Sequence, residues 1–128
     1  MPVTEDRKVL YLYFDESGNL DFSEHGTRYF LMTCVACRRP FRLARVLAGF
    51  RYDCLEQGIA LEKFHACEDT NPVRVGVYAR IAGGAADLRA VTVAVDKTSL
   101  GEDQRTGAQL YPLAFGAVMS AISFASVS

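Results

Sequence analysis

The fold class follows from the stretch Val9-Leu10-Tyr11-Leu12-Tyr13-Phe14-Asp15-Glu16, which is bulky and apolar at both alternating positions until it ends in two acids. A strand with one wet face alternates apolar and polar residues, whereas a strand covered on both faces is apolar throughout. We therefore predict a central strand over residues 9–16, which the turn residues Ser17-Gly18-Asn19 end.

Strands and helices alternate along the rest of the chain. β-branched and aromatic residues predict further strands, and apolar residues spaced by three and four predict helices. The predicted elements are strands over 9–16 and 28–38, a helix over 41–57, a short strand over 62–66, a helix over 71–81, a strand over 88–96 and an apolar helix from about 104. Because parallel strands need crossover connections of this length, the order predicts an α/β domain with a largely parallel sheet flanked by helices.

Size and charge place few limits on function. The 128 residues are one domain's worth, and 50% of them are hydrophobic, which suffices for a single core. The formal charge of -1 excludes a global field that would attract nucleic acid, so such binding needs a local patch. Residues 106–128 carry no charge, but their serines and Pro112 make a poor membrane span, and we expect no membrane partner.

The cysteines indicate a reduced, cytoplasmic setting. All four lie in apolar stretches and no signal peptide precedes them. Cys34 and Cys37 have the spacing of half a zinc site, yet residues three apart in a strand point to opposite faces. We therefore expect buried thiols at both positions.

Acids follow three of the predicted strands, namely Asp15-Glu16, Glu68-Asp69 and Asp96. If the strands are parallel, these carboxylates meet at one edge of the sheet, where ligands bind in open α/β folds. Repulsion between them would call for a cation, and oxygen ligands select Mg²⁺ or Mn²⁺. Two such ions cleave phosphodiesters in many nucleases, and His65 could assist proton transfer or contact a phosphate.

Ordinary explanations for the same acids stay open. The residues at 15–16 suit a turn, and those at 68–69 suit a helix N-terminus. Asp96 could pair with Lys97 or Arg89.

Arginines gather without an acid just before and within the first predicted helix. Arg38, Arg42 and Arg45 have the spacing of a shared helical face, which could hold a phosphate backbone. A solvated helix face is the alternative.

Three segments together resemble a known family. Tyr13-Phe14-Asp15-Glu16-Ser17-Gly18-Asn19, Phe64-His65-Ala66 and Val95-Asp96-Lys97 are similar to the bacterial and phage domain-of-unknown-function family 3800, whose fold is ribonuclease-H-like. The resemblance implies that Asp15 is the first-strand metal ligand and Asp96 a second ligand. Glu16 and His65 match the family's signature and would belong to the site.

One departure from the family bears on activity. Members usually continue with another strand and a late Ala-Asp motif on a C-terminal helix, whereas this chain stops at Ser128. We therefore expect a single domain over residues 1–128 that lacks its C-terminal part, and an apolar last helix that invites a homodimer.

Two functional hypotheses follow. The first is a metal-dependent nuclease or phosphodiesterase with the catalytic residues Asp15, Glu16, His65 and Asp96 and the metal ligands Asp15, Asp96 and Glu68. The second is a binding or assembly module that keeps the fold but lacks a complete ligand set.

Overall fold

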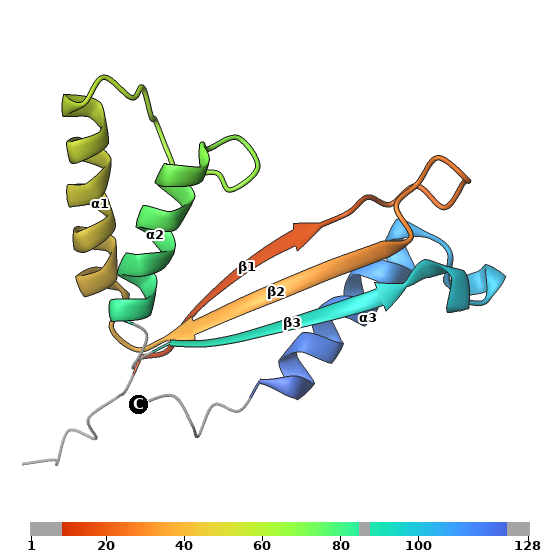
Figure 1. The fold of residues 1–128 in the computed structure, drawn as a ribbon. Helices are drawn as coiled ribbons and strands as arrows, with labels where there is room; N and C mark the ends of the chain where they lie inside the picture. The colour runs from red at the N-terminus through yellow and green to blue at the C-terminus, as the bar shows by residue number, and fades with distance from the viewer. Residues whose placement is uncertain (1–8, 85–87, 123–128) are drawn as a thin grey trace, which may run out of the picture.

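The sheet has three strands in the order β1 (Tyr11–Ser17), β2 (Tyr29–Cys37) and β3 (Leu88–Asp96). The structure is a computed structural model that describes residues 9–84 and 88–122. Its helices are α1 (Pro40–Glu56), α2 (Asn71–Gly83) and α3 (Gly107–Ala121), and two short 3₁₀ turns, Lys97–Ser99 and Glu102–Gln104, join β3 to α3. The chain is thus a mixed α/β fold (Figure 1).

The predicted parallel sheet is wrong, because β2 is antiparallel to both of its neighbours. The short strand expected over residues 62–66 is also absent, and turns and irregular chain occupy that stretch. This turn region joins α1 directly to α2, so the chain leaves the end of β2 along one helix and returns along the other. It therefore enters β3 beside the end of β2, which makes the pair antiparallel.

The predicted central strand lies at an edge of the sheet. Within the part of the chain that the structure describes, β1 pairs with β2 alone, and β2 is the middle strand. The apolar character of residues 9–14 has two separate causes: Phe14 packs against Phe115 of α3 at 5.0 Å between ring centroids, while Tyr11 contacts Phe41 of α1 at 5.5 Å. Both faces of β1 are thus contacted by helices, although one of its edges is unpaired.

The core lies between α3 and one face of the sheet. Four residues of α3 and its C-cap, spaced by four, form a buried stripe against alternate residues of β2. The buried residues of this cluster are Phe30, Met32, Cys34, Ala36, Leu110, Ala114, Val118 and Ile122. Cys34 belongs to this face and Cys37 to the other, as the strand period predicts, and both thiols are buried and unbridged.

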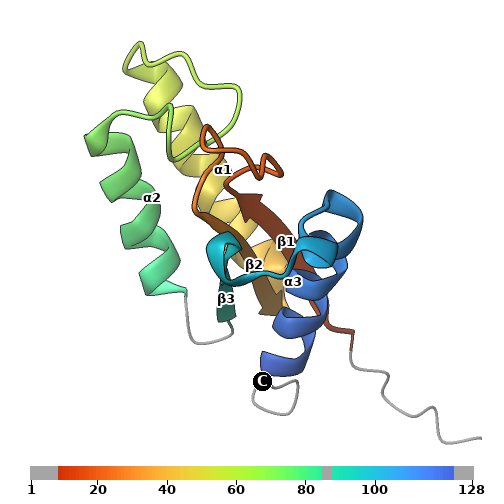
Figure 2. The ribbon, with the colours of Figure 1, turned by 90° about the vertical axis from the view of Figure 1, so that its right-hand side faces the viewer.

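The helices α1 and α2 pack as a pair on the other side of the sheet. Phe50 of α1 stacks on Phe64 at 5.6 Å and lies directly against Gly76 of α2. Figure 2 shows the sheet between α3 and this pair. The pair approaches the sheet near the start of β1, and the face that it overlooks carries a hydroxyl pair, Thr33 with Thr92 at 2.8 Å.

The apolar C-terminal segment forms α3, whose 15 residues end at Ala121. Within residues 9–84 and 88–122, no helix has both the length and the apolar character that crossing a bilayer requires. Tyr111, Leu113 and Phe115 of α3 are partly exposed, although Tyr111 and Phe115 also contact rings of the sheet. The homodimer expected through this helix stays a prediction.

Candidate functional site

Asp15 and Asp96 lie on one face of the sheet but far apart. β1 and β3 run in the same direction, since both are antiparallel to β2, and the two acids oppose Thr33 and Tyr29, respectively. Those partners are four positions apart on β2, which is roughly 13 Å along the strand, and β2 itself separates the acids by roughly 10 Å more across the sheet. Oxygens that share one Mg²⁺ lie within about 4 Å of each other. The two acids therefore cannot ligate one ion in this arrangement.

The carboxylate of Asp96 is occupied by protein donors. Arg28 donates to both of its oxygens, from Nε to Oδ1 at 3.4 Å and from Nη2 to Oδ2 at 3.1 Å. The backbone N–H and the hydroxyl of Thr98 donate to Oδ1 at 3.1 and 2.7 Å, which caps the first 3₁₀ turn. The partner of Asp96 is thus Arg28, 68 positions away in the sequence, which is neither of the partners suggested by the sequence, Lys97 and Arg89.

Because of these bonds, the free energy of unfolding should change with pH in the acid range. The side-chain bonds from Arg28 and then Thr98 lower the pKa of Asp96 from 3.8 to about 2. Because the folded pKa lies below the unfolded one, ionised Asp96 stabilises the fold above about pH 4, and this contribution disappears as the pH falls towards 2. We expect urea unfolding between about pH 4 and pH 2 to show a smaller loss of stability in Asp96→Asn than in the parent chain. Parallel stability curves for the two proteins would contradict this account.

Asp15 and Glu16 point to opposite faces, since successive strand residues alternate. Asp15 is exposed, and its Oδ1 accepts a hydrogen bond from the backbone N–H of Glu16 at 3.0 Å. Glu16 opposes Met32, so it belongs to the α3 side of the sheet. The structure therefore separates two residues that the sequence places in one site.

His65 and Glu68 lie in the turn between α1 and α2, not at a strand end. The backbone N–H of His65 donates to Oδ2 of Asp69 at 2.8 Å, and its carbonyl accepts from the N–H groups of Glu68 and Asp69. Their side chains are exposed. Among the residues that the structure describes, no three His, Cys, Asp or Glu side chains come close enough to form a metal site.

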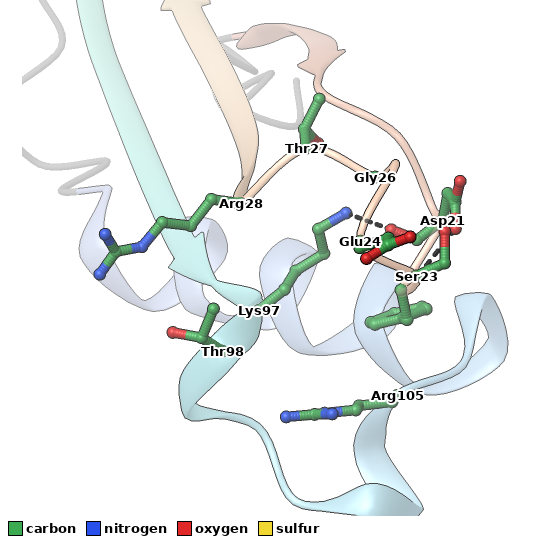
Figure 3. Close-up of a pocket in the computed structure, with 10 residues that line it drawn as sticks. Asp21, Ser23, Glu24, Gly26, Thr27, Arg28, Lys97, Thr98 and Arg105 are labelled. Carbon is green, nitrogen blue, oxygen red and sulfur yellow. Dashed lines mark hydrogen bonds between the residues drawn. The ribbon is translucent and has the colours of Figure 1, made fainter.

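Lys97 is a charged residue that is buried, with 5% of its surface exposed. Its ammonium donates to the carbonyl and the side-chain oxygen of Asn19, at 3.1 and 3.2 Å. It also donates to the carbonyl of Asp21 at 2.7 Å (Figure 3). The same Asn19 oxygen accepts from the backbone N–H of Thr27 at 3.1 Å. One buried cation thus holds the β1–β2 loop together.

Gly18 of the family-like signature has a structural reason in this loop. Its φ of +91° lies in the left-handed region, and a Cβ there would lie 2.4 Å from the carbonyl oxygen of Tyr29. Only glycine fits both constraints. At least part of the signature therefore serves the loop.

A hollow of about 290 Å³, the loop hollow, lies beside Lys97. Its lining residues are Asp21, Phe22, Ser23, Glu24, Gly26, Thr27, Arg28, Lys97, Thr98 and Arg105 (Figure 3). The charged groups here are already partnered: Arg28 with Asp96, Lys97 with loop oxygens, and Arg105 with the carbonyl of Leu100. The polar groups of the loop hollow therefore stabilise the loop itself and leave little capacity to bind a ligand.

The arginines predicted to bind nucleic acid do not all lie on one helical face. Arg38 precedes α1, which starts at Pro40, so it does not share a helical face with Arg42 and Arg45. Arg39, Arg42 and Arg45 are exposed, and none of them forms an ion pair with a carboxylate of residues 9–84 or 88–122. A concentration of positive charge thus remains where α1 begins.

A second hollow of about 430 Å³, the base hollow, lies at the same place. Its lining residues are Cys37, Arg39, Arg42, Leu43, Val46, Arg80, Gly83, Gly84 and Leu88. They come from the end of β2, the start of α1, the end of α2 and the start of β3. The base hollow combines apolar walls with three arginines, and none of its lining residues carries a carboxylate.

Sequence reasoning did not identify Arg28, Lys97 or Arg80. A lysine is among the residues least expected to be buried, so nothing in the sequence marks Lys97 as an anchor. Arg80 lies 38 positions from Arg42 in the sequence, and only the packing of α1 on α2 brings both to the base hollow.

Comparison of the chain with protein-family models, curated proteins and solved structures found no match.

Proposed function

We propose that this chain is a nucleic-acid-binding module of ribonuclease-H-like fold with an incomplete set of metal ligands. The carrying observation is the arginine cluster, defined as Arg39, Arg42, Arg45 and Arg80, at the meeting point of α1 and α2. The ribonuclease-H-like assignment rests on the family-like segments around Asp15, together with the mixed α/β architecture.

The local charge favours a polyanion as partner. No Asp or Glu occurs in residues 25–52 or 70–84, so the described residues where the two helices meet carry no acid, and the next acid along the sequence is Asp87. Guanidinium groups bind phosphate oxygens through paired hydrogen bonds, and each contact releases counterions from the nucleic acid. The overall charge of -1 does not oppose this, because binding depends on the local patch.

The positions and partners of Asp15 and Asp96 favour a binding function over cleavage. Asp96 is engaged by Arg28 and Thr98, and Asp15 is too distant to complete its coordination of an ion. Two-metal cleavage needs carboxylates that converge on ions about 4 Å apart. The arrangement of these strands does not provide that convergence.

We expect Arg42→Gln to weaken binding to a labelled single-stranded oligonucleotide and to lower the salt dependence. Each phosphate contact contributes close to one unit to the slope of log K against log salt, so the slope should fall by about one. Fluorescence anisotropy between about 50 and 200 mM salt measures it. The matched control is Lys63→Gln, which removes one charge from the exposed α1–α2 turn. Equal slopes for the parent chain and both variants would sink the proposal.

A metal-dependent phosphodiesterase is the second candidate, and Asp15 favours it. This carboxylate is exposed on the sheet face that α1 and α2 overlook, the side from which the turn with His65 projects (Figure 1). Adding Mn²⁺ to the same titrations tests it. If the oligonucleotide is cleaved and Asp15→Asn abolishes the cleavage, the protein is a nuclease and not a binding module. If the oligonucleotide stays intact, the result favours the binding module.

A further inference from the structure

We propose that the base hollow binds the terminal phosphate of a nucleic-acid strand, with the terminal nucleotide against its apolar wall. This inference rests on the proposed function and names the part of the nucleic acid that the arginine cluster recognises.

The base hollow has the size and composition of a ligand site. Its volume of about 430 Å³ falls in the range of small-molecule pockets. Leu43, Val46 and Leu88 form an apolar wall, while Arg39 and Arg42 contribute guanidinium groups. Such a combination suits a ligand with an anionic end and a flat face that packs on aliphatic side chains, and the phosphate and base of a nucleotide supply these two parts.

Arg80 lines the base hollow, and its guanidinium is held beside the hollow by residues that do not line it. Its guanidinium carbon lies 3.7 Å from the centroid of the Phe50 ring, and its Nη1 donates to the carbonyl of Gly76 at 3.0 Å. Phe50 is itself fixed, because it packs directly on Gly76 and stacks on Phe64. A guanidinium restrained by stacking loses little further freedom when it binds an anion.

The start of α1 adds to the positive potential of these guanidinium groups. Arg39 occupies the N-cap position, where no side chain accepts a bond from the first turn, and the first turn contains no acid. The first backbone N–H groups of a helix lack intrahelical partners and favour a negative charge. They reinforce the attraction that the arginines of the hollow exert.

A terminal phosphate fits this site better than an internal one. A phosphomonoester carries about -1.5 to -2 charges at neutral pH and has three acceptor oxygens. An internal phosphodiester carries one charge and continues into the chain on both sides. The exposed Arg39 and Arg42 at the hollow, with Arg80 beside them, therefore favour the strand end.

The test compares two oligonucleotides of one sequence, one with a 5′-phosphate and one with a 5′-hydroxyl, and repeats the comparison with the 3′ end. We expect about tenfold tighter binding of at least one phosphorylated strand, which is about 1.4 kcal/mol. Arg42→Gln should remove this preference, and Lys63→Gln should keep it. Thermal unfolding verifies that the variants fold. If Arg42→Gln does not fold, the same comparison is made with Arg39→Gln.

The outcomes separate this inference from the proposed function. Salt-dependent binding with equal affinity for phosphate and hydroxyl ends would overturn the terminal-phosphate site and leave the binding module intact. If no oligonucleotide binds, the proposed function fails, and adenosine monophosphate then tests the hollow by NMR. Arg42-dependent shifts of the amides of Gly83, Gly84 and Leu88 would support it, and unshifted amides would overturn it.

Discussion

Phe30→Ala should lower the free energy of unfolding by about 3–5 kcal/mol, which is one of the two largest effects we expect in this protein. Phe30 is 2% exposed, lies on the middle strand opposite Val95, and faces Tyr111 of α3 at 6.4 Å between ring centroids. Its removal would leave a cavity between sheet and helix that the surrounding elements cannot close. Urea unfolding followed by circular dichroism measures the loss.

Tyr29→Ala provides the matched control. This neighbour of Phe30 belongs to the same strand but points to the opposite face, where it is 45% exposed. We expect a cost of about 1 kcal/mol or less, since the substitution creates no cavity. Equal losses for the two variants would mean that the core does not lie on the α3 side of β2.

Lys97→Met should cost about 2–4 kcal/mol, because it removes the ammonium while keeping the length and apolar body of the side chain. The oxygens of Asn19 and Asp21 would lose a charged donor, and bonds to charged groups contribute more than neutral ones. Amide hydrogen exchange over residues 19–27 should accelerate as well, whereas exchange in the middle of β2 should keep its rank as the slowest.

Lys63→Met tests whether this effect is specific. Lys63 is exposed in the turn between α1 and α2, so the same substitution should change stability by no more than about 0.5 kcal/mol. If Lys97→Met costs as little as Lys63→Met, the ammonium does not anchor the loop, and the contacts of Phe22 and Leu100 would have to hold it instead.

The helices and most strands follow from local patterns in the sequence. The helix predicted over residues 41–57 is α1, and the helix predicted from residue 71 is α2, whose N-cap is Thr70, so that Asn71 and Pro72 are its first two residues. The strand predicted over residues 88–96 has the bounds of β3. These predictions succeed because hydrophobic periodicity and capping act within a few residues.

The candidate site was much less predictable. Its geometry depended on parallel strands, and the strand expected over residues 62–66 was the evidence for them. That stretch is a turn in the α1–α2 connection. His65 lies within it and Glu68 just after it, so neither residue is at a strand end. A short apolar run is ambiguous from periodicity alone, so one wrong element changed the direction of the next strand.

The sequence by itself determined where the chain is helical, where it is extended and which face of each element is apolar, because these properties depend on neighbouring residues. Only the tertiary structure decided that β1 lies at an edge, that Asp96 is paired with Arg28, that Lys97 is buried and that Arg80 joins Arg42 at the base hollow. Each of these joins segments far apart in the chain. Their proximity follows from the antiparallel return through α1 and α2, which no local pattern encodes.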